Sequence, residues 1–105
     1  MVVIALSVLT ILEKTKTRTE TNPMVVGGHY TAYDIDGNKY FIEFTEVDKD
    51  GVLWTVKVNG NPIKIAPVIT PMIISNGLIL EAYFDSDQNP CVKVIGTARY
   101  RERHA

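Results

Sequence analysis

The strongest constraint on the fold is an alternation of apolar and polar residues with a period of two, which begins at Lys39. In the run 39–47, Tyr40, Ile42 and Phe44 are separated by residues that include Glu43 and Thr45. The runs 52–58, 78–84 and 91–101 alternate in the same way. Successive side chains of a β-strand point to opposite faces, so this period predicts half-buried strands. The β-branched and aromatic residues that dominate these runs favour the same structure.

Turn residues separate the runs at short intervals. Asp-Gly occurs at 36–37 and 50–51, and Asn-Gly at 59–60 and 76–77, which are the dipeptides of tight hairpins. The stretch 63–72 contains two prolines, so we expect an edge or a bend between two halves of the sheet there. The pattern predicts one all-β domain over 1–105, an antiparallel meander of roughly seven to nine strands. We expect it to form a small barrel or a strongly coiled sheet.

The first 21 residues are ambiguous because they contain no Gly, Pro, Asn or Asp. The segment 15–21 alternates threonine with charged residues, which favours a strand. The apolar segment before it fits either a bent strand or a helix at about 2–13 packed on the sheet, which would make the fold α+β. We expect a long N-terminal strand or arm over 1–21. Its apolar part is too short to span a bilayer and lacks the basic start of a leader peptide, so no membrane partner is expected.

Composition bounds the function. Hydrophobic residues make up 46% of the chain and charged residues 22%, with a formal net charge of −1. These values are those of a soluble globular domain, and the charge gives no reason to expect nucleic acid as a partner. The single cysteine, Cys91, cannot form an intramolecular disulfide, so we expect a reducing, cytoplasmic location. No sequence motif implies a cofactor.

Hairpin chemistry predicts two registers. A three-residue loop at 49–51 would place Ile42 opposite Val58, Phe44 opposite Val56 and Glu46 opposite Trp54, so that both apolar faces coincide. A two-residue turn at 36–37 would place Tyr33 opposite Tyr40, Thr31 opposite Ile42 and His29 opposite Phe44. A three-residue loop there is the alternative, and it would turn the odd positions of 29–33 outward.

The two-residue turn at 36–37 would place a polar cluster inside the barrel, where it could orient an apolar or aromatic ligand. The candidate ligand-binding residues are His29, Thr31, Tyr33, Tyr40, Ile42, Phe44, Glu46 and Trp54. His29, Tyr33 and Glu46 could also serve as acid–base groups of a small enzyme if they share a cavity.

Two aspartate-rich triplets resemble the start of a calcium loop. They comprise Asp34, Asp36 and Asn38 in the first case, and Asp85, Asp87 and Asn89 in the second. Neither has the glycine at the sixth position or the glutamate at the twelfth that a helix–loop–helix calcium site requires. We therefore predict hairpin tips and no metal site.

The Thr-rich segment 15–21 is the main functional hint. A flat strand with threonine on one side and mixed charges on the other can pair with another chain. The function that we expect is a non-catalytic binding or assembly module that self-associates, as a dimer, through strand edges. A barrel for an apolar ligand and a small enzyme are the alternatives. If the two terminal strands pair, basic residues near both ends could gather, but glutamates interrupt them and argue against nucleic acid.

Overall fold

The structure is a computed structural model that describes residues 15–101, with the side chains of 17–98. The expected arm 1–21 is therefore described from Thr15 onward, where it is strand. The helix considered at about 2–13 lies outside the described residues.

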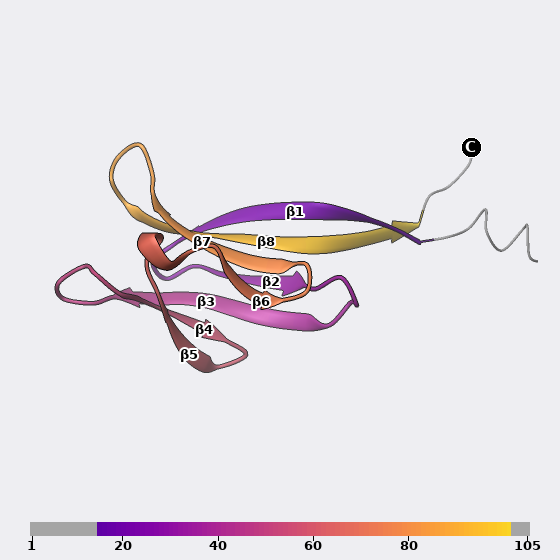
Figure 1. The fold of residues 1–105 in the computed structure, drawn as a ribbon, viewed down its shortest axis with the longest axis horizontal. Helices are drawn as coiled ribbons and strands as arrows, with labels where there is room; N and C mark the ends of the chain where they lie inside the picture. The colour runs from indigo at the N-terminus through magenta and orange to yellow at the C-terminus, as the bar shows by residue number, and fades with distance from the viewer. Residues whose placement is uncertain (1–14, 102–105) are drawn as a thin grey trace, which may run out of the picture.

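The described residues form eight β-strands and one short 3-10 helix, arranged as two antiparallel sheets (Figure 1). The elements are β1 (Thr15–Val25), β2 (His29–Tyr33), β3 (Lys39–Val47), β4 (Trp54–Val58), β5 (Asn61–Ile65), η1 (Pro67–Ile69), β6 (Met72–Ser75), β7 (Leu78–Phe84) and β8 (Pro90–Arg101). The strand order is β1-β8-β7-β6 in one sheet, called sheet A here, and β2-β3-β4-β5 in the other, called sheet B. The all-β, antiparallel prediction is confirmed.

Neither sheet closes into a barrel. The chain leaves sheet B after β5 and enters sheet A at β6, and η1 makes this crossing within the proline-containing stretch 63–72. The bend predicted there is confirmed. Because proline cannot donate to a sheet ladder, this stretch interrupts the meander and leaves two sheets in place of one closed ring.

The core lies between the two sheets and is made by the side chains that the period of two placed inward. Phe44 and Trp54 stack with ring centroids 5.6 Å apart, and Phe84 meets Trp54 edge-on at 5.4 Å. The largest fully buried apolar side chains come from both sheets: Trp54, Phe44, Ile42, Ile65, Leu78, Leu80, Val56, Val92 and Val94. Burial of this apolar surface is the main stabilising contribution.

The hairpin of β3 and β4 has the predicted register at its open end. Ile42 lies opposite Val58 and Phe44 opposite Val56. Near the turn the prediction is wrong, because a bulge between Phe44 and Glu46 shifts the pairing by one residue. Val47 therefore lies opposite Trp54, and Glu46 points outward to solvent.

The predicted register of β2 and β3 is wrong, and Asp34 gives the reason. Tyr33 lies opposite Lys39 and Thr31 opposite Phe41, so the loop comprises the five residues 34–38. The Asp34 Oδ1 atom accepts hydrogen bonds from the backbone N–H groups of Asp36 and Asn38, both at 2.9 Å. This side chain organises a wider loop than the Asp-Gly pair predicts, and the odd positions of β2 face outward.

The second aspartate triplet forms the same kind of loop between β7 and β8. Asp85 Oδ1 accepts from the backbone N–H groups of Asp87 and Asn89, again at 2.9 Å. In both loops the first aspartate of the triplet caps its own backbone. The triplets lie at hairpin tips, as predicted.

Candidate functional site

The longest edge strand of the structure is β1, which pairs with β8 along its whole length. The register runs from Thr15 opposite Arg101 to Val25 opposite Cys91. No described strand pairs with the other side of β1 (Figure 1). We call this side the β1 edge.

The backbone orientation at the β1 edge follows from two observations. Pro23 lies opposite Lys93 within the ladder, and proline is accommodated where its nitrogen points away from the partner strand. The carbonyl of Val25, two residues later, accepts a hydrogen bond from Gly28 N at 2.8 Å and so also points away from β8. Because orientation alternates along a strand, the N–H and C=O groups of Thr17, Thr19 and Thr21 point out at the β1 edge.

The side chains along the β1 edge are accessible to a partner. Thr17, Thr19 and Thr21 are exposed. On the opposite face of the strand, Arg18 Nη2 lies 3.4 Å from Glu20 Oε1, and these side chains are 63% and 37% exposed. The other oxygen of Glu20 accepts a hydrogen bond from Tyr30 Oη of β2 at 3.2 Å. The edge thus combines exposed threonines with one basic and one acidic group.

Part of β1 belongs to a two-stranded ribbon that extends beyond the rest of sheet A (Figure 1). The ladder between β7 and β8 reaches only Ile79 opposite Ile95, whereas β1 and β8 continue to Arg101. An isolated two-stranded ribbon is marginally stable in water, and a third strand stabilises it.

The remaining edges of the two sheets are shorter or interrupted. β2 and β5 have five residues each, and β5 contains Pro62. β6 has four residues and a register shift between Ile73 and Ser75. Short strands, prolines and bulges protect edges from pairing with other chains. The β1 edge has such protection only at Pro23, near its end.

Basic residues of the two terminal strands do not face one another directly. Lys16 and Arg18 lie opposite Tyr100 and Ala98, whereas the arginines at 99 and 101 lie opposite Thr17 and Thr15. The terminal strands therefore pair as considered from the sequence, but their basic positions are offset by one residue.

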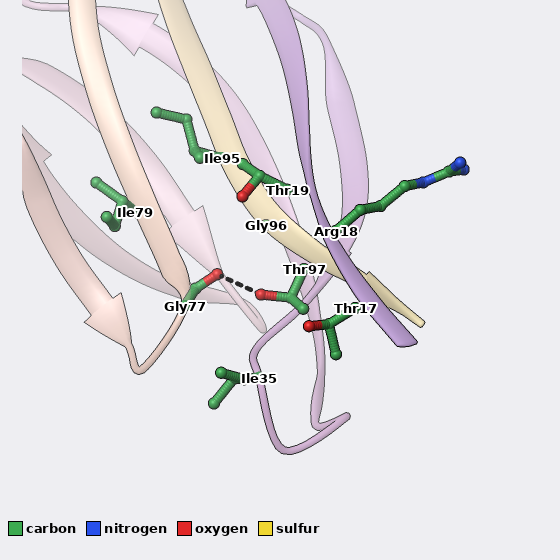
Figure 2. Close-up of a pocket in the computed structure, with 9 residues that line it drawn as sticks. All are labelled: Thr17, Arg18, Thr19, Ile35, Gly77, Ile79, Ile95, Gly96 and Thr97. Carbon is green, nitrogen blue, oxygen red and sulfur yellow. Dashed lines mark hydrogen bonds between the residues drawn. The ribbon is translucent and has the colours of Figure 1, made fainter. Parts of the chain in front are cut away.

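A small groove of about 280 Å³ lies beside the ribbon (Figure 2). Figure 2 shows the hydroxyl groups of Thr17, Thr19 and Thr97 on the side that faces Gly77 and Ile79, while Arg18 points away. Thr97 Oγ1 donates a hydrogen bond to the carbonyl of Gly77 at 3.1 Å. The groove is at the lower limit of ligand pockets, which are typically about 300–1,000 Å³. It does not by itself indicate a small-molecule site.

The eight candidate residues predicted from the sequence do not form one site. Ile42, Phe44 and Trp54 are fully buried in the core. Tyr40 is half-buried, and its hydroxyl donates to Asp34 Oδ2 at 3.0 Å. The structure thus gives these four side chains packing or hydrogen-bonding partners within the fold.

The other four candidates are exposed on the outer face of sheet B. They are His29, Thr31, Tyr33 and Glu46. The ring of His29 lies 5.4 Å from that of Phe41, a contact the sequence interpretation did not include. The five-residue loop and the bulge in β3 separate this group from the inner four. A binding role for either group remains a prediction.

Cys91 is buried and lies 3.8 Å from Asp85 Oδ2. Burial and the adjacent Asp85 carboxylate raise the pKa of the Cys91 thiol above its ordinary value. The thiol is therefore protonated near neutral pH, which agrees with a structural role and not with that of a nucleophile.

Sequence reasoning missed the cluster around Asp34, which is the buried polar centre of the fold. Asp34 Oδ2 accepts hydrogen bonds from Asn38 Nδ2, Tyr40 Oη and Ser75 Oγ at 2.9–3.0 Å. Ser75 belongs to β6 of sheet A, so this contact joins the two sheets. The triplet spacing drew attention to Asp34, but no local pattern could indicate Ser75, which lies 41 residues away.

Comparisons with protein-family models, curated proteins and solved structures found no match. Within residues 15–101, no helix is long and apolar enough to cross a membrane.

Proposed function

We propose that this protein is a non-catalytic assembly module whose β1 edge binds a strand of a second copy. The observation that supports it is an eleven-residue edge strand on which the N–H and C=O groups of Thr17, Thr19 and Thr21 point away from β8. An extended strand added there would receive the ladder hydrogen bonds typical of β-augmentation.

The ribbon strengthens this proposal. The part of β1 and β8 beyond Ile95 lacks a third strand among the described residues. Pairing with a second copy would build a continuous sheet across the two molecules. A two-fold axis satisfies both edges at once and limits the assembly to a dimer.

The test substitutes Thr19→Pro and measures mass in solution by light scattering after size-exclusion chromatography. Proline at position 19 removes a donor that points away from β8, so the ladder within the chain is retained while the edge loses a bond. We expect the wild-type protein to be a dimer at micromolar concentration and the variant to be a monomer with unchanged circular dichroism.

Lys64→Pro is the matched control. Lys64 lies two residues after Pro62 in edge strand β5, so its N–H also points away from the neighbouring strand. This variant loses the Lys64–Asp48 ion pair of 3.1 Å, so its melting temperature falls, but it remains a dimer. A monomeric wild-type protein, or a dimer that survives Thr19→Pro, would contradict the proposal.

A further inference from the structure

We propose, on the basis of the self-association just described, that two copies pair antiparallel about a two-fold axis at Thr19. Arg18 of each copy then lies opposite Glu20 of the second copy. The partner is thus a second β1 strand, bound in one register.

Backbone orientation restricts the possible registers. The groups that point out at the β1 edge belong to the odd-numbered residues Thr17, Thr19 and Thr21, as Pro23 and Val25 show. In an antiparallel pair, residues that exchange both hydrogen bonds lie directly opposite each other. Odd residues must therefore pair with odd residues, and the two-fold axis passes through one residue position.

The charges of facing residues discriminate between the possible positions of the two-fold axis within 17–20. An axis at Thr17 places Lys16 opposite Arg18, and an axis at Arg18 places two arginines opposite each other. An axis at Glu20 does the same with two glutamates. Like charges directly opposite are destabilising, whereas opposite charges stabilise a strand pair.

An axis at Thr19 produces two Arg18–Glu20 pairs and no like-charge pair. Both side chains are accessible for this exchange, at 63% and 37% exposed, and they already contact each other within one chain. Thr17 then lies opposite Thr21 of the second copy, so the three threonines contribute the central hydrogen bonds. An axis further along, at Thr21, would place Arg18 opposite Met24 and Glu20 opposite Asn22, so the two copies would form no opposite-charge pair there. Pro23, which has no N–H to donate, would then lie opposite Thr19, whereas with the axis at Thr19 it lies opposite Thr15, at the start of the described strand.

Cysteine cross-linking tests the register independently of charge. With the axis at Thr19, the two copies of residue 19 are opposite each other with Cα atoms about 5.5 Å apart, within disulfide range. Thr19→Cys should form a cross-linked dimer on mild oxidation. Thr17→Cys is the control, because its two copies would be about 13 Å apart at 3.3 Å per residue. Native Cys91 is buried and common to both variants.

Charge exchange supplies the second test. Arg18→Glu and Glu20→Arg should each weaken the homodimer about tenfold in sedimentation equilibrium, because each creates two like-charge contacts. Mixing the two variants should restore a one-to-one heterodimer at wild-type affinity. This restoration cannot come from the contact within one chain, since neither variant regains it.

The results of these experiments distinguish a failure of the register from a failure of the proposed function. Efficient cross-linking of Thr17→Cys but not Thr19→Cys, or a mixture that stays monomeric, overturns the register while a dimer sensitive to Thr19→Pro keeps the proposed function. A monomeric wild-type protein overturns both.

Discussion

Asp34 shows how one side chain can determine a register. Its two carboxylate oxygens accept hydrogen bonds from two backbone N–H groups of the loop and from Asn38, Tyr40 and Ser75. The desolvation of Asp34 by itself raises its pKa, but these hydrogen bonds outweigh it and hold the pKa well below the ordinary value. Asp34 is thus ionised in the folded protein and connects the 34–38 loop to sheet A.

The depressed pKa of Asp34 predicts a pH dependence of stability. Its stabilising contribution is complete above the ordinary aspartate pKa of about 3.9 and is lost as pH falls toward the lower pKa of the folded state. In the variant Asp34→Asn, the free energy of unfolding should therefore fall less steeply as the pH is lowered. Urea unfolding from pH 2 to 7, followed by fluorescence of the buried Trp54, measures the free energy of unfolding at each pH.

Asp85→Asn is the matched control for this prediction. Hydrogen bonds from the backbone and side chain of Asn89, from the backbone of Asp87 and from the weak donor Cys91 also lower the pKa of Asp85. Among the described residues, however, no tyrosine or serine hydroxyl donates to Asp85 as Tyr40 and Ser75 do to Asp34. For Asp85→Asn we expect a smaller change in the slope of the unfolding free energy against pH than for Asp34→Asn. Equal changes would show that the contacts from Tyr40 and Ser75 do not contribute.

The two hairpins of sheet B that share β3 show what a sequence can predict at this scale. Alternation correctly predicted that Ile42, Phe44 and Trp54 point inward, because burial of one face is a local pattern. The placement of His29, Thr31 and Tyr33 inside was wrong. It depended on loop length, which a carboxylate and a distant serine determine and which the Asp-Gly dipeptide does not reveal.

At the scale of elements, the turn between β6 and β7 forms a joint with the neighbouring strands. The N–H of Ile35 donates to Asn76 O at 2.8 Å, and Thr97 Oγ1 donates to Gly77 O. Gly77 has φ +81°, and a Cβ atom there would lie 2.7 Å from Thr97 Oγ1 and 3.1 Å from the backbone nitrogen of Ile35. The joint therefore requires glycine for both conformation and space.

Gly60 provides a control for the joint, because its φ is also +81° but nothing lies within 4 Å of an added Cβ atom. We expect Gly60→Ala to lower the free energy of unfolding by about 1 kcal/mol, the cost of a positive φ. Gly77→Ala should cost a further 1–3 kcal/mol or so from overpacking. Chemical denaturation measures both variants. Equal decreases in the free energy of unfolding for the two variants would mean that the residues around Gly77 accommodate a Cβ atom without overpacking.

At the scale of the whole molecule, the two sheets described within residues 15–101 have four edges, and of these edge strands only β1 is long and continues, with β8, past the end of the β7 ladder. The alternation of threonine with charged residues in 15–21 predicted a strand and suggested that the protein self-associates through it. The sequence could not show that β8 would pair with β1 alone past Ile95, because that depends on where β7 ends.

Residue-resolved amide hydrogen exchange, measured at low and high protein concentration, tests the β1 edge most directly. The amides of Arg18 and Glu20 face β8 and should be protected at both concentrations. The amides of Thr17, Thr19 and Thr21 should exchange rapidly when the protein is dilute and become protected as the dimer forms. Protection of these threonine amides that does not change with concentration would contradict assembly through this edge.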